Sequence, residues 1–453
     1  MSRGWGAMSG GAQRGSELGA HTVRLEDVIE AVQEALVAAE ASGEARRWDD
    51  LEREAFAHDA ATAYVARRAR EAIEAGATPM PISAENELIR RAIAAYFHAG
   101  KFQALLDLPG VTDIMVNGHD AIWLQRVDGT LERYDEPIFA DADDLRDEVA
   151  HLARRAGGTE RRFDDAKPIL VLRLPDGSRL AAIMNVSPVP QVAIRRNVLP
   201  DATLDDLEAR GTIDRAMHSL LTASMRAGMR VVVSGETGAG KTTLLRAMTN
   251  VLPADTRIVV IEDTRELDLG ADPRRASSVL EWETREANIE GVGEITQREL
   301  VRHALRFNPA WLIVGEVRDG DAAREMLLAM QHGHPSLSTV HHHSALSAWK
   351  KLAQYVAQGS EAVEFAIAAL LISDAVDFFV HLGRDRSGRR AVTEICEVAG
   401  WNGAEVQLNR LFVPGPDGRG IPQPHLTDLR RAKLCDHGFE DHLLLHEAGW
   451  WHS

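Results

Sequence analysis

The segment 231–243, VVVSGETGAGKTT, constrains the fold of this chain more than any other part of the sequence. A β-branched run leads into a glycine-rich loop that ends in lysine and threonine, which is the phosphate-binding pattern G-x-x-x-x-G-K-[ST] between a strand and a helix. The glycines let successive backbone N–H groups point toward one phosphate, because such a turn uses conformations that a Cβ disfavours. The residues expected to hold a nucleoside triphosphate are Gly235, Glu236, Thr237, Gly238, Ala239, Gly240, Lys241, Thr242 and Thr243.

Two side chains of this loop have specific predicted roles. Lys241 is expected to reach the β- and γ-phosphates, and Thr242 is expected to bind a magnesium ion. A glycine-rich surface turn is the other interpretation of the segment, but it leaves the lysine unexplained. We therefore expect nucleoside triphosphate chemistry with Mg²⁺.

Composition argues against several other classes of protein. The chain has 453 residues, 45% of them hydrophobic, so it can build two or three cores without disulfides. A formal net charge of −17 disfavours non-specific binding to nucleic acids. Cys396 and Cys435 are expected to be free thiols, as in a reducing cytosol. The late apolar run FAIAALLISDAVDFFVHL is interrupted by Asp374 and Asp377, so we expect no transmembrane segment.

Periodicity and composition divide the chain into five parts. Apolar residues recur at helical spacing in the second part, at Val28, Ile29, Val32, Leu36 and Val37. Short β runs with turn signals fill the third part, and strands alternate with helices in the fourth, as in a parallel sheet. The predicted parts are a disordered tail at 1–22, a helical module at 23–78, an α+β domain at 85–200, an α/β domain at 205–420 and an uncertain C-terminal tail at 421–453.

Acidic and histidine side chains follow the predicted parallel strands. Glu262 and Asp263 end the run RIVVIED, Glu316 ends WLIVGE, and His341 ends SLSTVH. Ligands of parallel sheets bind at the carboxyl ends of the strands, so we expect these side chains to meet the loop in one crevice. Glu262 and Glu316 are both candidates for the base that activates water, and Glu316 also for holding magnesium. Each acid taken alone could instead cap the next helix.

His341 is placed to hydrogen-bond a γ-phosphate and so to report its presence. The neighbouring histidines His332, His334, His342 and His343 allow a zinc site as an alternative. Adjacent side chains of a strand point to opposite faces, and no cysteine or carboxylate pattern accompanies these histidines. The phosphate contact is therefore the preferred interpretation.

Arg179 and Arg195 lie on β-like runs of the third part of the chain. An arginine from another domain or subunit can stabilise the charge that develops during phosphoryl transfer. Sequence alone favours ordinary surface charges for both residues.

With these motifs in view, the chain resembles the secretion and pilus-assembly ATPases of type II and type IV systems, most closely the CpaF-like ATPases of Tad/Flp pili. The resemblance covers roughly residues 85–412. It rests on the segments LPGVTDIMVNG, RLPDGSRLAAI, GETGAGKTTLL, RIVVIEDTREL, LIVGEVRD and GHPSLSTVH. The acidic strand end at Glu262 and Asp263 and the segment Asn288–Gly291 are specific to this family.

The resemblance implies a hexameric ring in which each subunit has an N-terminal α/β domain and a C-terminal RecA-like domain, with ATP and Mg²⁺ bound between them. Carried over by position, Lys241 and Thr242 belong to Walker A, Glu262 and Asp263 to the Asp box, Glu316 to Walker B and His341 to the His box. Arg179 and Arg195 match two arginines that reach the phosphates. The implied function is a cytoplasmic motor at the inner face of the plasma membrane, which drives pilus assembly or secretion with an integral membrane platform protein as partner.

The chain also departs from the family pattern. His332 stands in place of a threonine, a glycine is missing after His334, and Ala310 stands where an acid is usual. We expect an altered rate or coupling rather than a loss of hydrolysis. Two alternatives stay open, namely a conjugative DNA-transfer motor of the same superfamily and an ATP-binding regulator with little hydrolysis. A small-molecule P-loop kinase is a further possibility, which the GEVRD and STVH motifs argue against.

Overall fold

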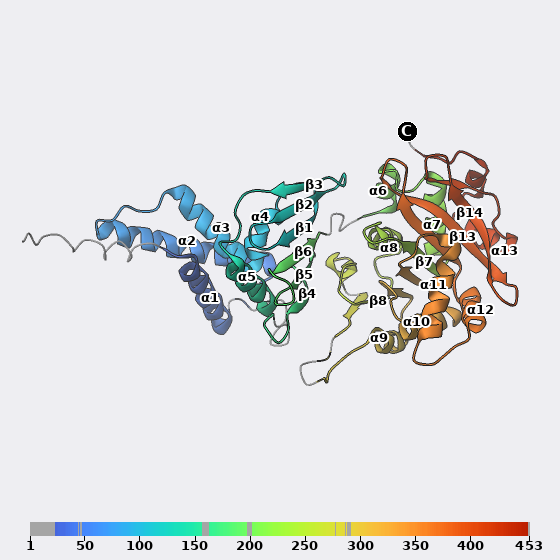
Figure 1. Cartoon of the computed structure of the whole chain (residues 1–453), viewed down its shortest axis with the longest axis horizontal. Helices are drawn as coiled ribbons and strands as arrows, with labels where there is room; N and C mark the ends of the chain where they lie inside the picture. Colours follow the sequence, from blue (N-terminus) through green and yellow to red (C-terminus); the bar gives the residue numbers. More distant parts are fainter. Residues whose placement is uncertain are drawn as a thin grey trace, which may run out of the picture. The chain divides into compact units, whose positions relative to one another are not determined.

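The computed structural model of this chain describes residues 23–43, 45, 48–155, 163–196, 202–276, 278–285, 287 and 291–451 (Figure 1). Contacts divide the chain into two compact units, unit 1 (1–196) and unit 2 (197–453). The tail predicted at 1–22 and the family segment at 288–290 lie outside the described residues. Within the described ranges, no helix combines the length and the apolar character that a membrane span needs.

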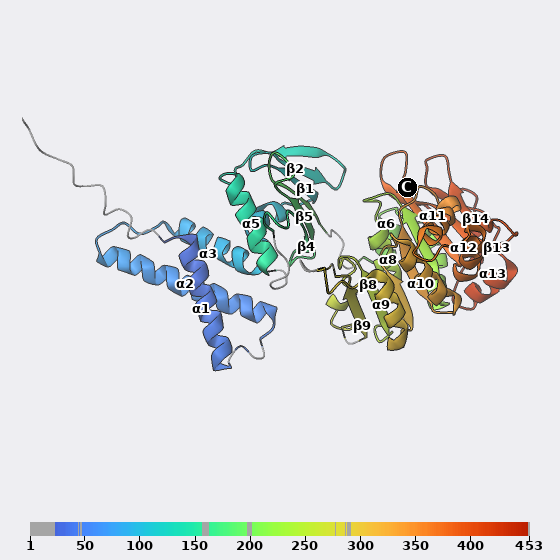
Figure 2. The ribbon, with the colours of Figure 1, turned by 60° about the horizontal axis from the view of Figure 1, so that its bottom comes forward.

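Unit 1 begins with three helices that pack against one another (Figure 2). They are α1 (Leu25–Ser42), α2 (Asp50–Glu74) and α3 (Ile82–Phe97). The start of α2 is fixed by a capping box, in which Asp49 accepts from the N–H of Glu52 and the Glu52 carboxylate accepts from the N–H of Asp49. Val28 and Val32 of α1 are buried, as predicted. Val37 was expected in the same core but is 57% exposed, because it lies outside the apolar stripe.

The second part of unit 1 is an antiparallel sheet with the strand order β3-β2-β1-β6-β5-β4. Its strands are β1 (Val111–Asn117), β2 (Ile122–Arg126), β3 (Leu131–Tyr134), β4 (Ile169–Arg173), β5 (Arg179–Ile183) and β6 (Gln191–Arg195). One face packs on α5 (Ala142–Arg155) and the short helix α4 (Gln103–Leu106), where Leu170 and Leu172 of β4 join Leu145 and Val149 of α5 in one core. Alternate residues of β4 are buried, as expected for a sheet with one covered face. The α+β prediction is confirmed.

Unit 2 is built on a sheet with the order β15-β14-β13-β12-β7-β11-β10-β8-β9. Its strands are β7 (Val231–Gly235), β8 (Ile258–Glu262), β9 (Val279–Glu283), β10 (Trp311–Val314), β11 (Ser336–Val340), β12 (Phe378–Arg384), β13 (Arg390–Trp401), β14 (Val406–Pro414) and β15 (Gly420–Pro422). The pairs from β12 to β9 are parallel, and those from β12 to β15 are antiparallel. The predicted α/β fold with a mainly parallel sheet is confirmed, although β9 and the antiparallel strands were not predicted.

Helices cover both faces of this sheet (Figure 1). One face packs on α6 (Leu204–Ala209), α7 (Arg215–Arg226) and α8 (Lys241–Thr249). The other packs on α9 (Gln297–Ala304), α10 (Gly320–Gln331), α11 (Ala345–Gln358) and α12 (Phe365–Ala375). Val231 and Val233 of β7 face the first layer and Val232 faces the second, which explains why this strand is an uninterrupted apolar run.

The C-terminal segment folds onto unit 2. It contains α13 (Asp428–Cys435) and a short 3₁₀ helix at Asp441–Leu445. Leu434, Phe439 and Leu443 are buried in the same core as the phosphate-loop strand. The sequence left residues 421–453 as an uncertain tail, and as far as residue 451 the structure describes them packed on unit 2. The contacts of this segment join residues that are far apart in the sequence, so no local sequence pattern indicated these contacts.

Candidate nucleotide-binding site

The glycine-rich loop joins β7 to α8 in the geometry that its sequence predicts. Gly238 and Gly240 have φ values of +75° and +102°, which residues with a Cβ rarely adopt. A Cβ at Gly235 would lie 2.7 Å from the carbonyl oxygen of Leu382, so the neighbouring strand β12 also requires glycine there. Lys241, the first residue of α8, donates through Nζ to the carbonyl oxygens of Gly235 (3.0 Å) and Glu236 (3.1 Å). The ammonium group is therefore held over the loop.

The four strands that carry the predicted site residues are consecutive in the sheet, in the order β7-β11-β10-β8. Because they are parallel, their carboxyl ends meet at the loop. Lys241 Nζ lies 3.2 Å from His341 Nδ1, and His341 Nε2 lies 2.5 Å from Glu316 Oε1. The contact between His341 Nε2 and Glu316 Oε1 is not a hydrogen bond. Glu316 Oε1 is buried and accepts no hydrogen bond in the described part of the chain. Lysine, histidine and glutamate thus come together as expected.

Burial is the main cause that lowers the pKa of His341, and the charge of Lys241 is the second. The ring is therefore neutral at neutral pH, so it can accept a proton or donate one N–H. Such a ring responds to the arrival of a negatively charged phosphate.

Arg318 is a site residue that the sequence analysis did not single out, although it belongs to the GEVRD motif. Its guanidinium donates to Glu316 Oε2 through Nε (3.0 Å) and Nη2 (2.5 Å), and through Nη1 to Asp263 Oδ2 (3.5 Å). It joins the acid after β10 to the acid after β8. The sequence pattern that could have indicated Arg318 is an arginine two residues after a strand-end acid. This pattern is too common to be specific.

Glu262 is 5% exposed at the end of β8. Burial raises its pKa to about 8, although backbone N–H groups of Leu267 and Glu266 donate to the carboxyl group and oppose the rise. Glu262 is therefore mostly protonated at neutral pH. A Cβ at Gly315 would lie 2.8 Å from Glu262 Cγ, so the glycine before Glu316 makes room for this side chain.

Thr242 and Glu316 were predicted to bind magnesium. Thr242 Oγ1 donates to Glu266 Oε2 at 3.5 Å, which is a long contact that an ion could replace. The buried Oε1 of Glu316 contacts His341 but accepts no hydrogen bond, and it is an oxygen ligand of the kind that Mg²⁺ prefers, directly or through water. The residues present fit a magnesium-bound triphosphate.

The other histidines of the predicted cluster do not form a ligand set. The rings of His342 and His343 stand 4.2 Å apart, and His342 Nε2 contacts Ser347 Oγ at 2.8 Å. In the part of the chain that the structure describes, no three His, Cys, Asp or Glu side chains gather as metal ligands.

Arg179 and Arg195 both lie in unit 1. They face each other directly across the β5–β6 ladder, and Arg195 Nε donates to Asp113 Oδ1 at 2.8 Å. The structure thus brings the two arginines to one place on the sheet of unit 1, while their contact with a nucleotide stays a prediction.

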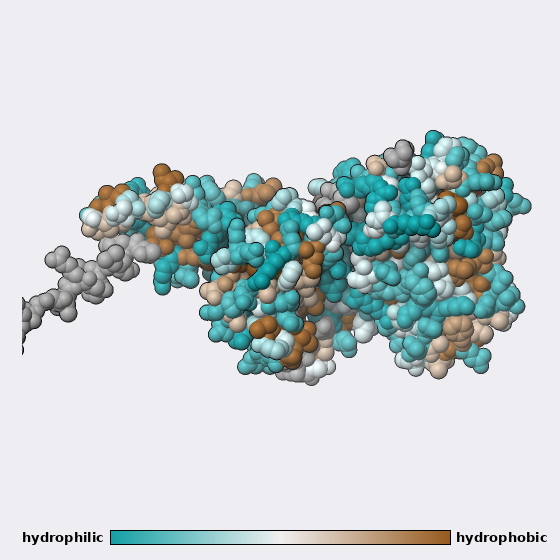
Figure 3. All heavy atoms as spheres, turned by 45° about the horizontal axis from the view of Figure 1, so that its top comes forward, coloured by the Kyte–Doolittle hydropathy of each residue, from teal (hydrophilic) through white to brown (hydrophobic). Residues whose placement is uncertain are grey.

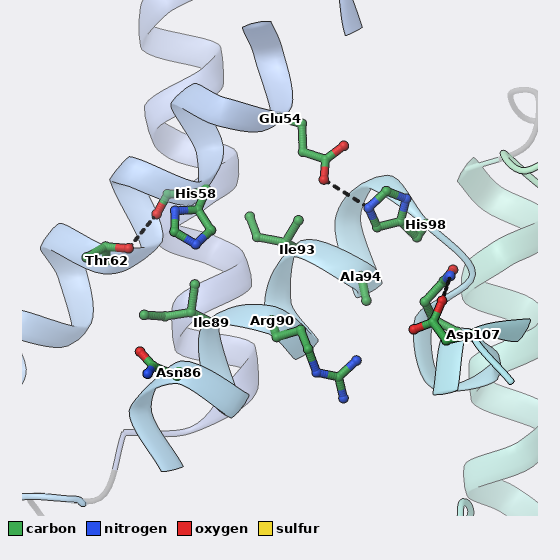
Figure 4. Close-up of a pocket in the computed structure, with 11 residues that line it drawn as sticks. Glu54, His58, Thr62, Asn86, Ile89, Arg90, Ile93, Ala94, His98 and Asp107 are labelled. Carbon is green, nitrogen blue, oxygen red and sulfur yellow. Dashed lines mark hydrogen bonds and ion pairs between the residues drawn. The ribbon is translucent and has the colours of Figure 1, made fainter. Parts of the chain in front are cut away.

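A pocket of about 500 Å³ lies elsewhere, in the helical part of unit 1 (Figure 4). Glu54 and His58 of α2 line one side, and Ile89 and Ile93 of α3 line another. His98 Nε2 contacts Glu54 Oε1 at 3.0 Å across it. On the face drawn in Figure 3, apolar side chains are interspersed among hydrophilic ones. The pocket lacks a phosphate-binding loop, so we place the candidate site at the strand ends of unit 2.

Comparison with known proteins gives a family match, similar sequences and a similar structure. A family model described as type II/IV secretion system protein matches residues 99–399. A Mycobacterium tuberculosis protein named provisionally for conjugal transfer is 35% identical over 306 residues, which are 66% of this chain and 83% of that protein. The conjugal transfer protein TrbB of Rhizobium radiobacter is 30% identical over 308 residues, 67% of this chain and 88% of that protein. The crystal structure of the VirB11 ATPase from the Brucella suis type IV secretion system covers 67% of this chain and 97% of its own, with 24% identity and a TM-score of 0.35.

Proposed function

The chain belongs to the type II/IV secretion system protein family, and from this membership we propose that it is an ATP hydrolase that powers a secretion or pilus machine. One observation carries the proposal: the phosphate-loop Lys241 lies within hydrogen-bond distance of His341, whose ring reaches the buried oxygen of Glu316. A lysine, a neutral imidazole and a carboxylate around one loop can together bind a triphosphate and activate water.

Each residue then has a defined task. Lys241 binds the β- and γ-phosphates, and Glu316 orients or deprotonates the attacking water, since its carboxylate contacts His341, which in turn contacts Lys241. His341 responds to the γ-phosphate. Magnesium, when bound, neutralises phosphate charge, and Thr242 and Glu316 would hold it. Glu262 fixes the turn 263–267 through the backbone N–H groups of that turn.

Arg179 and Arg195 would add positive charge during phosphoryl transfer. We further propose a hexamer at the inner face of the plasma membrane, in which ATP-driven domain movement acts on an integral membrane platform protein. These features are supported by the family and by the motifs quoted above.

Two machines of this family are candidates for the machine that this chain powers. The motif pattern favours the CpaF-like branch and pilus assembly, whereas the names of the relatives reported above favour conjugal transfer. Deleting the gene in its host and scoring surface pili and plasmid transfer in parallel separates the two. Loss of pili alone supports the first, and loss of transfer alone supports the second.

Hydrolysis is tested by phosphate release from the purified full-length chain. Lys241→Ala and Glu316→Gln should each lower turnover by about 10²–10³-fold, the usual effect of removing a preorganised charged group from such a site. Arg215→Ala, which breaks an exposed ion pair with Glu440, is the matched control and should leave turnover unchanged. Near-normal turnover in both Lys241→Ala and Glu316→Gln would defeat the site assignment. Tight ATP binding without turnover in the unmodified chain would favour a regulator.

A further inference from the structure

Arg318 is the residue that ties together the acidic ends of two strands. It binds Glu316 after β10 and Asp263 after β8, at the distances given above, with its side chain 48% exposed. A guanidinium presents its donors in a rigid fork, so it fixes two carboxylates relative to each other better than an ammonium group can. Arg318 therefore links the two strand-end acids.

Several carboxylates lie near the loop. They are Glu316, Asp263 and Glu266, of which Glu266 reaches the loop through Thr242. Lys241 and Arg318 supply positive charge beside them. A triphosphate brings several further negative charges to the same place, and like charges in a partly buried site repel strongly. The loop needs local positive charge before a nucleotide can bind.

We propose that Arg318 is a positioning residue that neutralises the strand-end carboxylates, so that the loop can accept a nucleotide before magnesium is present. This inference rests on the proposed nucleotide site. Magnesium, when bound, would supply positive charge at Glu316, one of these carboxylates. Removing Arg318 should therefore make nucleotide binding depend much more strongly on Mg²⁺.

The test is the equilibrium affinity of the full-length chain for a fluorescent ATP analogue, measured in EDTA and in excess Mg²⁺. For Arg318→Ala we expect the factor by which Mg²⁺ strengthens binding to rise about tenfold, within the usual range of coupling between two sites. Most of the change should be a loss of affinity in EDTA. Arg318→Lys keeps the charge without the fork, so it should recover most of the affinity in EDTA but little of the turnover, because Glu316 is no longer held.

Arg215→Ala, an arginine that also binds a carboxylate but lies on α7, is the control and should keep the unmodified ratio. Circular dichroism reports whether each variant is folded, and Arg318→Lys keeps the test available if Arg318→Ala is not. An equal loss of affinity in EDTA and in Mg²⁺, or no loss, would overturn the inference while leaving the nucleotide site intact. If the unmodified chain bound no nucleotide under either condition, the proposed function itself would fail.

Discussion

Two buried glutamates of the sheet in unit 2 are held in different ways. Glu397, on β13, is fully buried and accepts hydrogen bonds from Asn409 Nδ2 (3.0 Å), the N–H and Oγ1 of Thr427 (3.0 and 2.5 Å) and Arg430 Nη1 (3.2 Å). Glu262, at the end of β8, accepts from two backbone N–H groups and has its pKa raised to about 8.

The difference teaches where each acid can act. A buried carboxylate that binds a guanidinium is a structural link, because the ion pair holds two segments of chain together. A buried carboxyl group that meets only neutral donors is protonated near neutral pH and can change charge there. The first arrangement joins α13 to the sheet, and the second lies beside the phosphate loop.

The largest expected effect comes from breaking the first arrangement. Arg430→Ala should lower the free energy of unfolding by about 3–5 kcal/mol, because it leaves Glu397 buried without its cation. Arg430 also donates to Asp377 at 2.9 Å. Burial works to raise the pKa of Asp377, but the hydrogen bond and charge of Arg230, with the charge of Arg430, hold that pKa below its usual value. Equilibrium urea unfolding followed by tryptophan fluorescence measures the loss.

Arg431→Ala is the control for that variant. Arg431 is on the same helix, but its partner Asp428 is fully exposed, so its loss should change stability by at most about 0.5 kcal/mol. If the two variants were equally stable, the ion pair in the core would be no stronger than one on the surface, and the contrast with Glu262 would lose its basis.

The sequence predicted the loop side of this comparison and not the core side. The loop, Glu262, Glu316 and His341 follow apolar runs, and the rule that parallel strands present their carboxyl ends together places them in one crevice. Glu397 and Arg430 are 33 residues apart and belong to elements whose pairing depends on the whole sheet. No local spacing encodes such a contact, and the same holds for the packing of the C-terminal segment.

Strand β12 was not predicted for a related reason. The run FAIAALLISDAVDFFVHL spans α12 and most of β12. Its apolar residues are too dense for periodicity to separate the helix from the strand.

A smaller effect is expected from the pH dependence of stability. The folded-state pKa of Glu262 is raised above its unfolded value, so its stabilising contribution is full below about pH 4.5 and is lost as the pH rises through about 8. Glu262→Gln mimics the protonated acid and should remove a slope of about 1 kcal/mol per pH unit between pH 5 and 8. Urea unfolding at several pH values measures both slopes.

Glu405→Gln, at an exposed acid paired with Lys350, is the matched control and should leave the slope as it is. A slope that survives Glu262→Gln would mean that another group causes it. Glu262 would then not be the acid that changes charge, and the comparison would lose its second half.

The smallest effect sharpens the comparison by separating burial from position. Asp214 is 1% exposed and, like Glu262, accepts from backbone N–H groups, here those of Met217 (2.8 Å) and Trp450 (2.9 Å). Burial raises its pKa too. Asp214→Ala removes the N-cap of α7 and should cost about 1–2 kcal/mol, measured by urea unfolding.

The affinity for the fluorescent ATP analogue in Mg²⁺ then distinguishes the two acids. Asp214→Ala should leave this affinity unchanged, because Asp214 caps α7 and accepts a hydrogen bond from Trp450 of the C-terminal segment. Glu262→Ala should weaken it, because Glu262 fixes the turn that carries Asp263 and Glu266 beside the loop. Equal effects of the two variants would mean that burial alone, and not the place of Glu262 at the strand ends, sets its importance.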